Sequence, residues 1–557
     1  MGGADEAVRG GTGAHVVAQH ARAGLALPVK DGRIGGISRA KFFVVVLICS
    51  FCWYTVPGYF FPTITSMSWV CWLFSKSVTA QQLGSGLNGL AIGAFTLDWS
   101  TVVSFLGSPL VSPFFAIVNV FIGFVIFVYV AIPVAYWGLN LFDAKTFPVF
   151  SSELFAATGQ KYNITAIVND RFEIDMAAYE KQGRIYLSMF FALSYGFGFA
   201  AIAATFTHVL FFYGREIHDR YRASYKGKPD IHTRLMHKYA DIPGWWFYSL
   251  LLLTVAVSVV LCTVLKDQVQ LPVWGLFFAC ALAFIFTLPI SIITATTNQV
   301  NNLSHLFLFF FWLFRYRNLN PRSGEHQLEL MNSLLTLVVS QCNSIVGCCR
   351  SCEQLIGTII AGTINIGVAH WMLGSIDHIC DRARLPPNSP WTCPGDRVFF
   401  DASVIWGLVG PRRIFGPLGN YGSLDWFFLG GALGPVLVWG LHRAFPARSW
   451  IPLVNLPVLL GATGNMPPAS PINFTAWVVV GTVFNYAVYR RRKKWWERYN
   501  YILSAAMDAG VAFMGVLLYF ALNMENTSMD WWGIDEHCPL ATCPTAKAVQ
   551  VAGCPVF

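Results

Sequence analysis

Long apolar stretches recur along this chain, and they limit what it can fold into. A helix of about 20 apolar residues crosses the roughly 30 Å hydrocarbon core of a bilayer. Only 12% of the residues are charged and 55% are hydrophobic, whereas a soluble protein has about a quarter charged. The strong candidate spans are 42–62, 112–136, 187–213, 246–265, 271–294, 354–374, 424–442 and 500–522. The sequence therefore predicts a multi-pass membrane protein.

Weaker apolar stretches add to the expected number of spans. They are 303–314, 402–415, 450–463 and 474–489. Helices are the spanning structures that satisfy their own backbone groups in lipid. We expect an all-α, polytopic helical membrane protein with about nine to twelve spans, some of them broken or re-entrant.

Composition divides the chain into three parts. Residues 1–37 are polar and rich in Gly and Ala, so we expect a poorly ordered N-terminus without the apolar core of a signal peptide. Residues 38–522 form the predicted transmembrane bundle, and residues 523–557 form a Cys-containing tail. The net charge of +9 lies mainly in loops beside spans, so we expect contact with membrane lipid and not with nucleic acid.

Charge and sequons predict an orientation. The 214–245 loop carries seven Arg and Lys against four acids, and the 137–186 loop carries five against six. By the positive-inside rule, 214–245 and the basic stretch 490–498 face the cytosol, while 137–186 and the tail lie outside. Glycosylation sequons begin at Asn163 and Asn526, in the two parts predicted to be outside.

The cysteines fall into three groups. Five lie in apolar segments, where a thiol is usually a small hydrophobe: Cys49, Cys52, Cys71, Cys262 and Cys280. Two share one loop and three share the tail, and these pair as disulfides if they face an oxidising compartment: Cys380, Cys393, Cys538, Cys543 and Cys554. The stretch CCRSC at 348–352 lacks the second ligand pair of a zinc site, so no metal site is predicted.

Two polar segments interrupt the apolar pattern at 81–107 and 459–474, and a Thr- and amide-rich cluster ends the span before residue 299. Irregular backbone at membrane depth survives only where protein or a water-filled cavity covers it. Broken helices of this kind build the substrate sites of secondary transporters. Two interpretations stay open: these segments line a cavity, or they are surface loops between neighbouring spans.

Four ionisable residues in or beside apolar segments are candidates for proton coupling: Asp508, Asp98, His208 and His370. A carboxylate inside a span is costly, so Asp508 is expected to face the bundle interior or water. Each of the four has an alternative. Asp508 bonds a neighbouring helix or reaches the cytosolic face, the segment of Asp98 lies outside the membrane, and the histidines are hydrogen-bonded packing residues.

Candidate substrate contacts lie near the broken helices. They are the amide groups of Asn298, Gln299 and Asn465, and the guanidinium of Arg413, which suits a peptide carboxylate. An arginine marking a helix end is the alternative for Arg413. The chain contains no GxSxG, HExxH or phosphate-binding P-loop motif, so we expect neither an enzyme nor an ATP-driven pump.

Several long stretches together resemble the oligopeptide transporter family of plants. They are VPGYFFP (56–62), SVTAQQLGSGLNGLAIGAFTLDWSTVVSFLGSPL (77–110), HTRLMHKYADIPGWWF (232–247), SVIWGLVGPRRIFG (403–416), NFTAWVVVGTVFNYAVYRRRKKWWERYNYILSAAMDAG (473–510) and HCPLATCPTAKAVQVAGCPVF (537–557). The resemblance implies proton-coupled symport of short peptides, typically tetra- and pentapeptides, and of glutathione or metal chelates in some members.

The sequence departs from that family in two places. The family pattern implies further spans and an Asn-Pro-Gly motif, which do not appear before residue 38, and a Lys-Ile-Pro-Pro-Arg motif where GCCRSCEQ (347–354) stands. We therefore expect residues 1–37 to be a non-family N-terminus and residues 300–352 to be atypical for the family. We expect a plasma-membrane proton and peptide symporter that uses the proton gradient and no cofactor. A glutathione or metal-chelate carrier, or a transport-inactive truncated member, stays open as an alternative.

Overall fold

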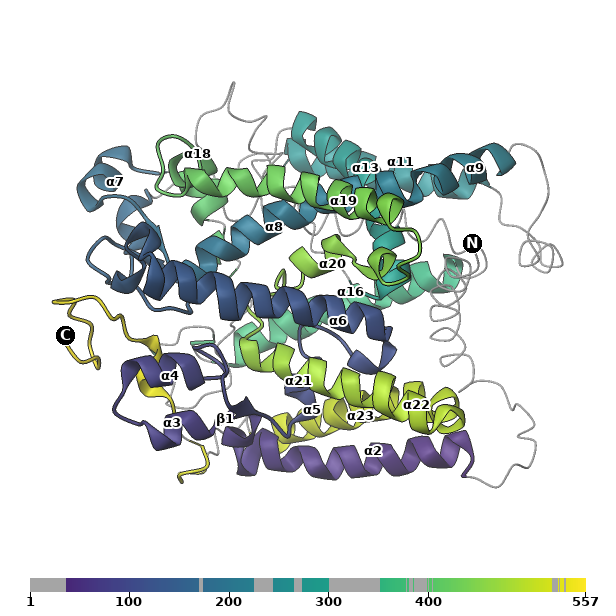
Figure 1. Ribbon diagram of the computed structural model, residues 1–557, viewed down its shortest axis with the longest axis horizontal. Coiled ribbons are helices and arrows are strands. Elements are labelled where there is room, and N and C mark those ends of the chain that lie inside the picture. The colour runs from purple at the N-terminus through teal and green to yellow at the C-terminus, as the bar shows by residue number, and fades with distance from the viewer. Residues whose placement is uncertain are drawn as a thin grey trace.

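A computed structural model gives the arrangement of the helices (Figure 1). It describes residues 37–169, 174–224, 244–264, 273–299, 351–376, 378, 379, 384, 398, 400–402, 404–522, 529, 531–534 and 537–557. Over these residues the chain is mainly helical, with two short antiparallel strand pairs, β1 (Met67–Ser68) with β2 (Ala94–Phe95) and β3 (Leu154–Phe155) with β4 (Tyr186–Leu187).

Within the described residues, seven helices are long and apolar enough to cross a membrane. They are Arg39–Phe60, Phe114–Gly138, Met189–Asp219, Val273–Thr297, Gly422–Ala444, Pro471–Arg491 and Lys493–Ala521. Two shorter apolar helices, Leu252–Val264 and Phe400–Val409, are also present. These helices confirm a polytopic helical membrane protein.

Two of the weaker candidate spans differ in outcome. The stretch 474–489 lies within the continuous span Pro471–Arg491. The stretch 450–463 is not one helix, because prolines interrupt it, and it divides into η11 (Ile451–Leu453) and α20 (Leu456–Leu460). The candidate 303–314 lies outside the described residues.

The long helices run roughly side by side along the bundle (Figure 1). Several α-helices continue as π-helical turns: α2 (Arg39–Thr55) into η1 (Val56–Phe60), α6 (Phe114–Phe124) into η4 (Val125–Ala131), α8 (Met189–His208) into η8 (Val209–Tyr213) and α21 (Pro471–Thr482) into η12 (Val483–Val488). The remaining long helices are α11 (Gly244–Val264), α13 (Val273–Thr297), α16 (Ser351–Ser375), α19 (Trp426–Ala444) and α23 (Lys493–Ala521).

Small residues let two helix pairs approach closely. A Cβ on Gly510 of α23 would lie 2.7 Å from the Cβ of Ser50 on α2, and one on Gly431 of α19 would lie 2.1 Å from the carbonyl oxygen of Ala200 on α8. Ser50 Oγ also donates to the carbonyl of Met507 at 2.9 Å. Close backbone approach of this kind supplies the van der Waals packing that holds membrane helices together.

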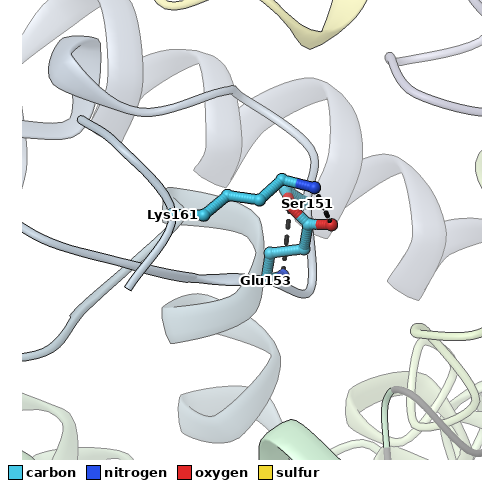
Figure 2. A network of polar contacts seen from close by, with 3 residues as sticks. All are labelled: Ser151, Glu153 and Lys161. Atoms are coloured by element: carbon cyan, nitrogen blue, oxygen red, sulfur yellow. Dashed lines mark hydrogen bonds and ion pairs between the residues drawn. The ribbon is translucent and has the colours of Figure 1, made fainter. Parts of the chain in front are cut away.

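Residues 139–169 and 174–188, between α6 and α8, form a folded lobe at one end of the bundle, here called the end lobe. Its strands β3 and β4 pair, and the Lys161 ammonium lies 2.7 Å from Glu153 Oε1, while Ser151 Oγ accepts from the Glu153 amide at 3.1 Å (Figure 2). Burial raises the pKa of Tyr162 to about 12, and its hydroxyl donates to the Gly183 carbonyl at 2.9 Å. The buried side chains of the lobe, such as Leu154, Tyr162 and Ile167, belong to the same hydrophobic core as the bundle helices.

The C-terminal tail folds back onto the same end of the bundle (Figure 1). Gln82 Nε2 donates to the Cys543 carbonyl at 2.7 Å, and the Thr545 amide donates to the Lys145 carbonyl of the end lobe at 2.9 Å. The tail, the end lobe and α4 (Val78–Gly84) therefore belong to one end, as the predicted orientation requires.

Two disulfides fix this tail. Cys543 pairs with Cys554, which confirms a pair within the tail, and Cys538 pairs with Cys71. The prediction that Cys71 is a free, packed thiol is therefore wrong. Its short helix α3 (Trp69–Leu73) lies beside the returning tail, although 467 positions separate the two cysteines in sequence.

The other cysteine predictions have two outcomes. The four remaining cysteines of the apolar segments form no disulfide, as expected: Cys49, Cys52, Cys262 and Cys280. Cys380 and Cys393 lie outside the described residues. The helices α9 (Gly214–Ser224) and α22 (Tyr489–Arg491), which carry the basic stretches, lie at the end opposite the tail (Figure 1). Which compartment each end faces stays a prediction.

A glycosylation assay tests this orientation. Asn163 is exposed on the end lobe, and its Oδ1 accepts from Thr165 Oγ1 at 2.7 Å. We expect endoglycosidase to increase the gel mobility of the wild-type chain and of a Thr165→Ser variant, because Ser keeps the sequon. Thr165→Ala should have a smaller shift. A shift that is identical for Thr165→Ala and Thr165→Ser would contradict glycosylation at Asn163.

Candidate functional site

A broken segment runs between the long helices at residues 98–112, here called the clamped segment. It contains the short helix α5 (Trp99–Val103) and the single turn η3 (Pro109–Val111). Positive φ angles of 66° at Phe105 and 70° at Gly107 separate the two. A helix cannot continue through such angles, so several backbone carbonyls here lack helical partners.

Side chains of α21 and η12 pair with the carbonyls of the clamped segment. Asn473 Nδ2 donates to the Thr101 carbonyl at 2.7 Å, and Trp477 Nε1 donates to that of Gly107 at 3.0 Å. Asn485 Nδ2 donates to the carbonyls of Pro109 and Ser112, both at 2.8 Å. An unpaired backbone carbonyl in an apolar interior costs several kcal/mol, about 2 to 7 by reference state. These side chains therefore make irregular backbone possible in the bundle.

Three further amides complete the clamp. Asn500 Nδ2 of α23 donates to the Leu110 carbonyl at 2.8 Å, and Asn465 Nδ2 donates to that of Phe105 at 2.7 Å. Gln299 Nε2, just after α13, donates to Ser112 Oγ at 3.0 Å. The clamped segment is thus held against the bundle by these donors, which argues against a surface loop for residues 98–107. The interpretation that it lines a cavity stays a prediction.

Asp98 begins the clamped segment and is 2% exposed. Its Oδ1 accepts from the Ser100 amide at 2.9 Å, and its Oδ2 accepts from Thr101 Oγ1 at 3.0 Å and from the Ser100 hydroxyl. This is the geometry of a helix N-cap. Asp98 therefore has a structural partner for each carboxylate oxygen.

Asp508 contacts Trp99, the residue that follows Asp98 in the chain. Its Oδ1 accepts from Trp99 Nε1 at 2.7 Å, and one turn earlier on α23 Ser504 Oγ lies 2.6 Å from Ser108 Oγ. The expectation that Asp508 faces the bundle interior or water stays a prediction, because its side chain is exposed while its Oδ1 contacts the buried Trp99. One oxygen contacts α5 while the rest of the carboxylate stays accessible.

The predicted amide contacts have two different roles. Asn465 and Gln299 meet at the clamped segment, where their donors bind protein groups. Asn298 does not: it is exposed, adopts a φ of 54° and donates its backbone amide to the Thr294 carbonyl at 2.8 Å. That is the left-handed residue that ends α13.

The two histidines lie away from the clamped segment. His208 is 3% exposed on α8 and stacks on Phe212 with ring centroids 4.5 Å apart. His370 is exposed on α16, next to Trp371, whose ring packs on Tyr519 at 5.8 Å. The four proton-coupling candidates therefore form one group of two, Asp98 and Asp508, and two separate residues.

Arg413 lies near the end lobe, in α18 (Pro411–Ile414). Its Nη1 donates to the Val409 carbonyl at 3.0 Å, at the end of the π-helical turn η9 (Val404–Val409). Arg413 and Arg184 both lower the pKa of Tyr179, although burial raises it more. The two arginines thus create a positive potential at this end of the bundle.

Most side chains of the clamp were not predicted from the sequence. A polar stripe at every fourth residue of α23 was the available signal: Trp496, Asn500, Ser504 and Asp508. Such spacing places side chains on one helix face, and each of the four contacts the clamped segment or Asn485, which binds it. Asp401, 3% exposed, is a further buried carboxylate that was missed.

Comparison with known proteins identifies the family. The family model described as OPT oligopeptide transporter protein matches residues 11–321 and 351–522. The chain belongs to this family. The match begins within the segment that we assigned to a non-family N-terminus, and its interruption at 322–350 falls inside the segment expected to be atypical.

Named relatives from Arabidopsis thaliana agree with the family assignment. The chain is 60% identical to Oligopeptide transporter 4 over 542 residues, which are 93% of this chain and 72% of that protein. It is 57% identical to Oligopeptide transporter 2, over 94% of this chain and 72% of that protein. It is 50% identical to Oligopeptide transporter 3, over 96% and 73% respectively. No solved structure matches the chain.

Replacing Asn485 tests the clamp. We expect Asn485→Leu to lower the melting temperature of the purified chain, because it leaves the Pro109 and Ser112 carbonyls without their donor at a cost of about 1–3 kcal/mol for each buried group. Val483→Ala is the matched control, since Val483 lies in the same π-helical turn and is 46% exposed. Equal melting temperatures for Asn485→Leu and the control would refute the clamp.

Proposed function

We propose that this chain is a symporter that carries short peptides across the plasma membrane with protons, using the proton gradient and no cofactor. The family and its members named oligopeptide transporters support a peptide substrate. The observation that carries the proton part is the contact between Trp99 of the clamped segment and the accessible carboxylate of Asp508.

Asp508 is the better proton acceptor of the two grouped carboxylates. Both oxygens of Asp98 accept hydrogen bonds that cap α5, so a proton there would remove the cap. Asp508 accepts a hydrogen bond from Trp99 Nε1, and its side chain is exposed. Hydrogen bonds to an ionised acceptor are roughly twice as strong as those to a neutral one. Protonation of Asp508 would therefore weaken the hold of α23 on α5.

Weaker contact with α23 would let the clamped segment move. Discontinuous helices in transporters contact substrate through the backbone groups that their breaks release. The donors of Asn465 and Gln299 bind the segment in this conformation. We propose that they contact the peptide when the segment shifts and these bonds open.

The peptide would first meet the positive region at the end lobe. Arg413 and Arg184 lie there, and both lower the pKa of Tyr179. A guanidinium suits the C-terminal carboxylate of a peptide, because it offers two parallel N–H donors. Glutathione and metal chelates of peptide-like acids carry the same carboxylate, so they are alternatives that a substrate competition separates.

Current recordings test the proposal. In voltage-clamped oocytes with the chain confirmed at the surface, a tetrapeptide at acid pH should produce an inward current that fades as the pH rises. Asp508→Asn should remove the pH dependence, whereas Glu497→Gln, exposed and eleven positions or roughly three turns earlier on the same helix, should not. If glutathione or a metal chelate competes for transport better than the peptide does, the alternative carriers are favoured. If none of these substrates produces a current, an inactive member is favoured.

The contact between Trp99 and Asp508 has its own test. Trp99→Phe removes the indole N–H and keeps an aromatic ring. If the two residues act through one hydrogen bond, the losses of uptake in Trp99→Phe and Asp508→Asn will not add in the double variant. Additive losses, with surface expression of all three variants equal, would separate proton coupling from this contact.

A further inference from the structure

A dense group of cations lies where α22 ends and α23 begins. Residues 490–494 are five consecutive Arg and Lys, and all five are exposed. The helix axis breaks at Arg492, which has φ −136° and ψ 51°, so the side chains project from two helix ends. These are Arg490, Arg491, Arg492, Lys493 and Lys494.

The start of α2 adds two more cations. Arg39 and Lys41 are exposed in its first turn. The Phe42 ring packs on Tyr499 with centroids 4.6 Å apart, and Tyr499 OH donates to the Ile37 carbonyl at 2.6 Å. The beginnings of α2 and α23 are therefore adjacent. Together the seven cations are called here the basic end cluster.

The cluster keeps most of its charge. The described residues place one ion pair in it, between Lys493 and Glu497 at 3.8 Å, with both side chains more than half exposed. Exposed pairs of this kind contribute about 0–1 kcal/mol. On α9, at the same end of the bundle (Figure 1), Arg215 and Arg222 instead alternate with Glu216 and Asp219. Concentrated positive charge thus distinguishes the basic end cluster from α9.

Aromatic rings lie beside the cations. The ends of the spans Pro471–Arg491 and Lys493–Ala521 place these rings at the membrane interface. Arg490 Nη1 donates to Tyr486 OH at 3.0 Å, and Lys493 lies over the Tyr489 ring at 5.6 Å. The Tyr489 ring packs edge-on against Trp496 with centroids 5.0 Å apart. Trp and Tyr collect at the level of lipid headgroups. The cations are therefore held where the phosphates of membrane lipids lie.

The geometry points to a ligand: we propose that the basic end cluster binds the phosphorylated headgroup of an anionic membrane lipid. Clusters of four to eight cations beside a span suit multivalent lipid headgroups, with about 1 kcal/mol for each Lys or Arg near the surface. Trp496, which packs on Tyr489 beside the cluster, also contacts the clamp. Its Nε1 donates to Asn485 Oδ1 at 3.0 Å. Bound lipid stabilises this end of α23 and, through Asn485, the clamped segment.

A lipid-binding assay tests the proposal without any transport. The full chain is placed in nanodiscs of phosphatidylcholine alone or with a few per cent of phosphatidylinositol 4-phosphate, and bound lipid is measured by native mass spectrometry. We expect the wild type to retain the phosphoinositide in preference to phosphatidylcholine. Arg490→Gln/Arg491→Gln/Arg492→Gln should bind it at least about tenfold more weakly, because three cations are lost.

Two comparisons keep the result specific. Arg215→Gln/Arg222→Gln removes two cations from α9 at the same end and should leave binding unchanged. Arg39→Gln/Lys41→Gln changes a different helix of the cluster and should weaken binding, so a folding defect of the triple variant does not decide the test. Equal retention by wild type and both cluster variants overturns the proposal.

The source of the phosphate is tested in the same experiment. Soluble inositol phosphate carries the headgroup charge without acyl chains. We expect it to bind much more weakly than the lipid, because the aromatic rings and the bilayer surface then contribute nothing. If it binds as tightly as the lipid, the cluster recognises a free phosphate compound and the lipid assignment is wrong.

Discussion

Side-chain donors that pair with backbone carbonyls hold the centre of this bundle together. The clamped segment breaks twice within a few residues, and in a membrane each freed carbonyl needs a partner. Asn473, Trp477, Asn485, Asn500 and Asn465 supply these partners, all from the stretch 465–500. The broken helix is therefore stable only while α21 and α23 lie against it, and the positions of those helices depend on it in turn.

The two carboxylates of this site are also arranged around the clamped segment. Asp98 caps α5 from within the clamped segment, and Asp508 reaches α5 from α23 through Trp99. Two carboxylates thus act on one short helix, one from inside the segment and one from outside. Since the outer carboxylate is accessible, it is the one whose charge can change without removing the cap. This division explains how a bundle with very few charges can keep a carboxylate in a span.

The sequence predicted the class of fold well and the site only in part. Apolar stretches and charge asymmetry are averages over many residues, so they gave the spans and the grouping of the tail with the end lobe. Asp508 stood out because a carboxylate in a span is costly, but its partner Trp99 lies 409 positions away. Asn485 and Asn500 were missed because a single amide in an apolar helix is common, and their carbonyl partners follow from two breaks that no local pattern reveals. Cys71 was misjudged for the same reason, since its partner is brought by the returning tail.

One face of α23 connects every part of this arrangement. Trp496, Asn500, Ser504 and Asp508 recur every four residues and contact Asn485, the Leu110 carbonyl, Ser108 and Trp99 in turn. Gly510, also on α23, packs closely against α2, so this contact limits how far α23 can move. A small rotation or shift of α23 would change all four polar contacts together, because they lie on one rigid helix. A change of charge at Asp508 and a change of ligand at the basic end cluster would therefore act on the same element, from its two halves.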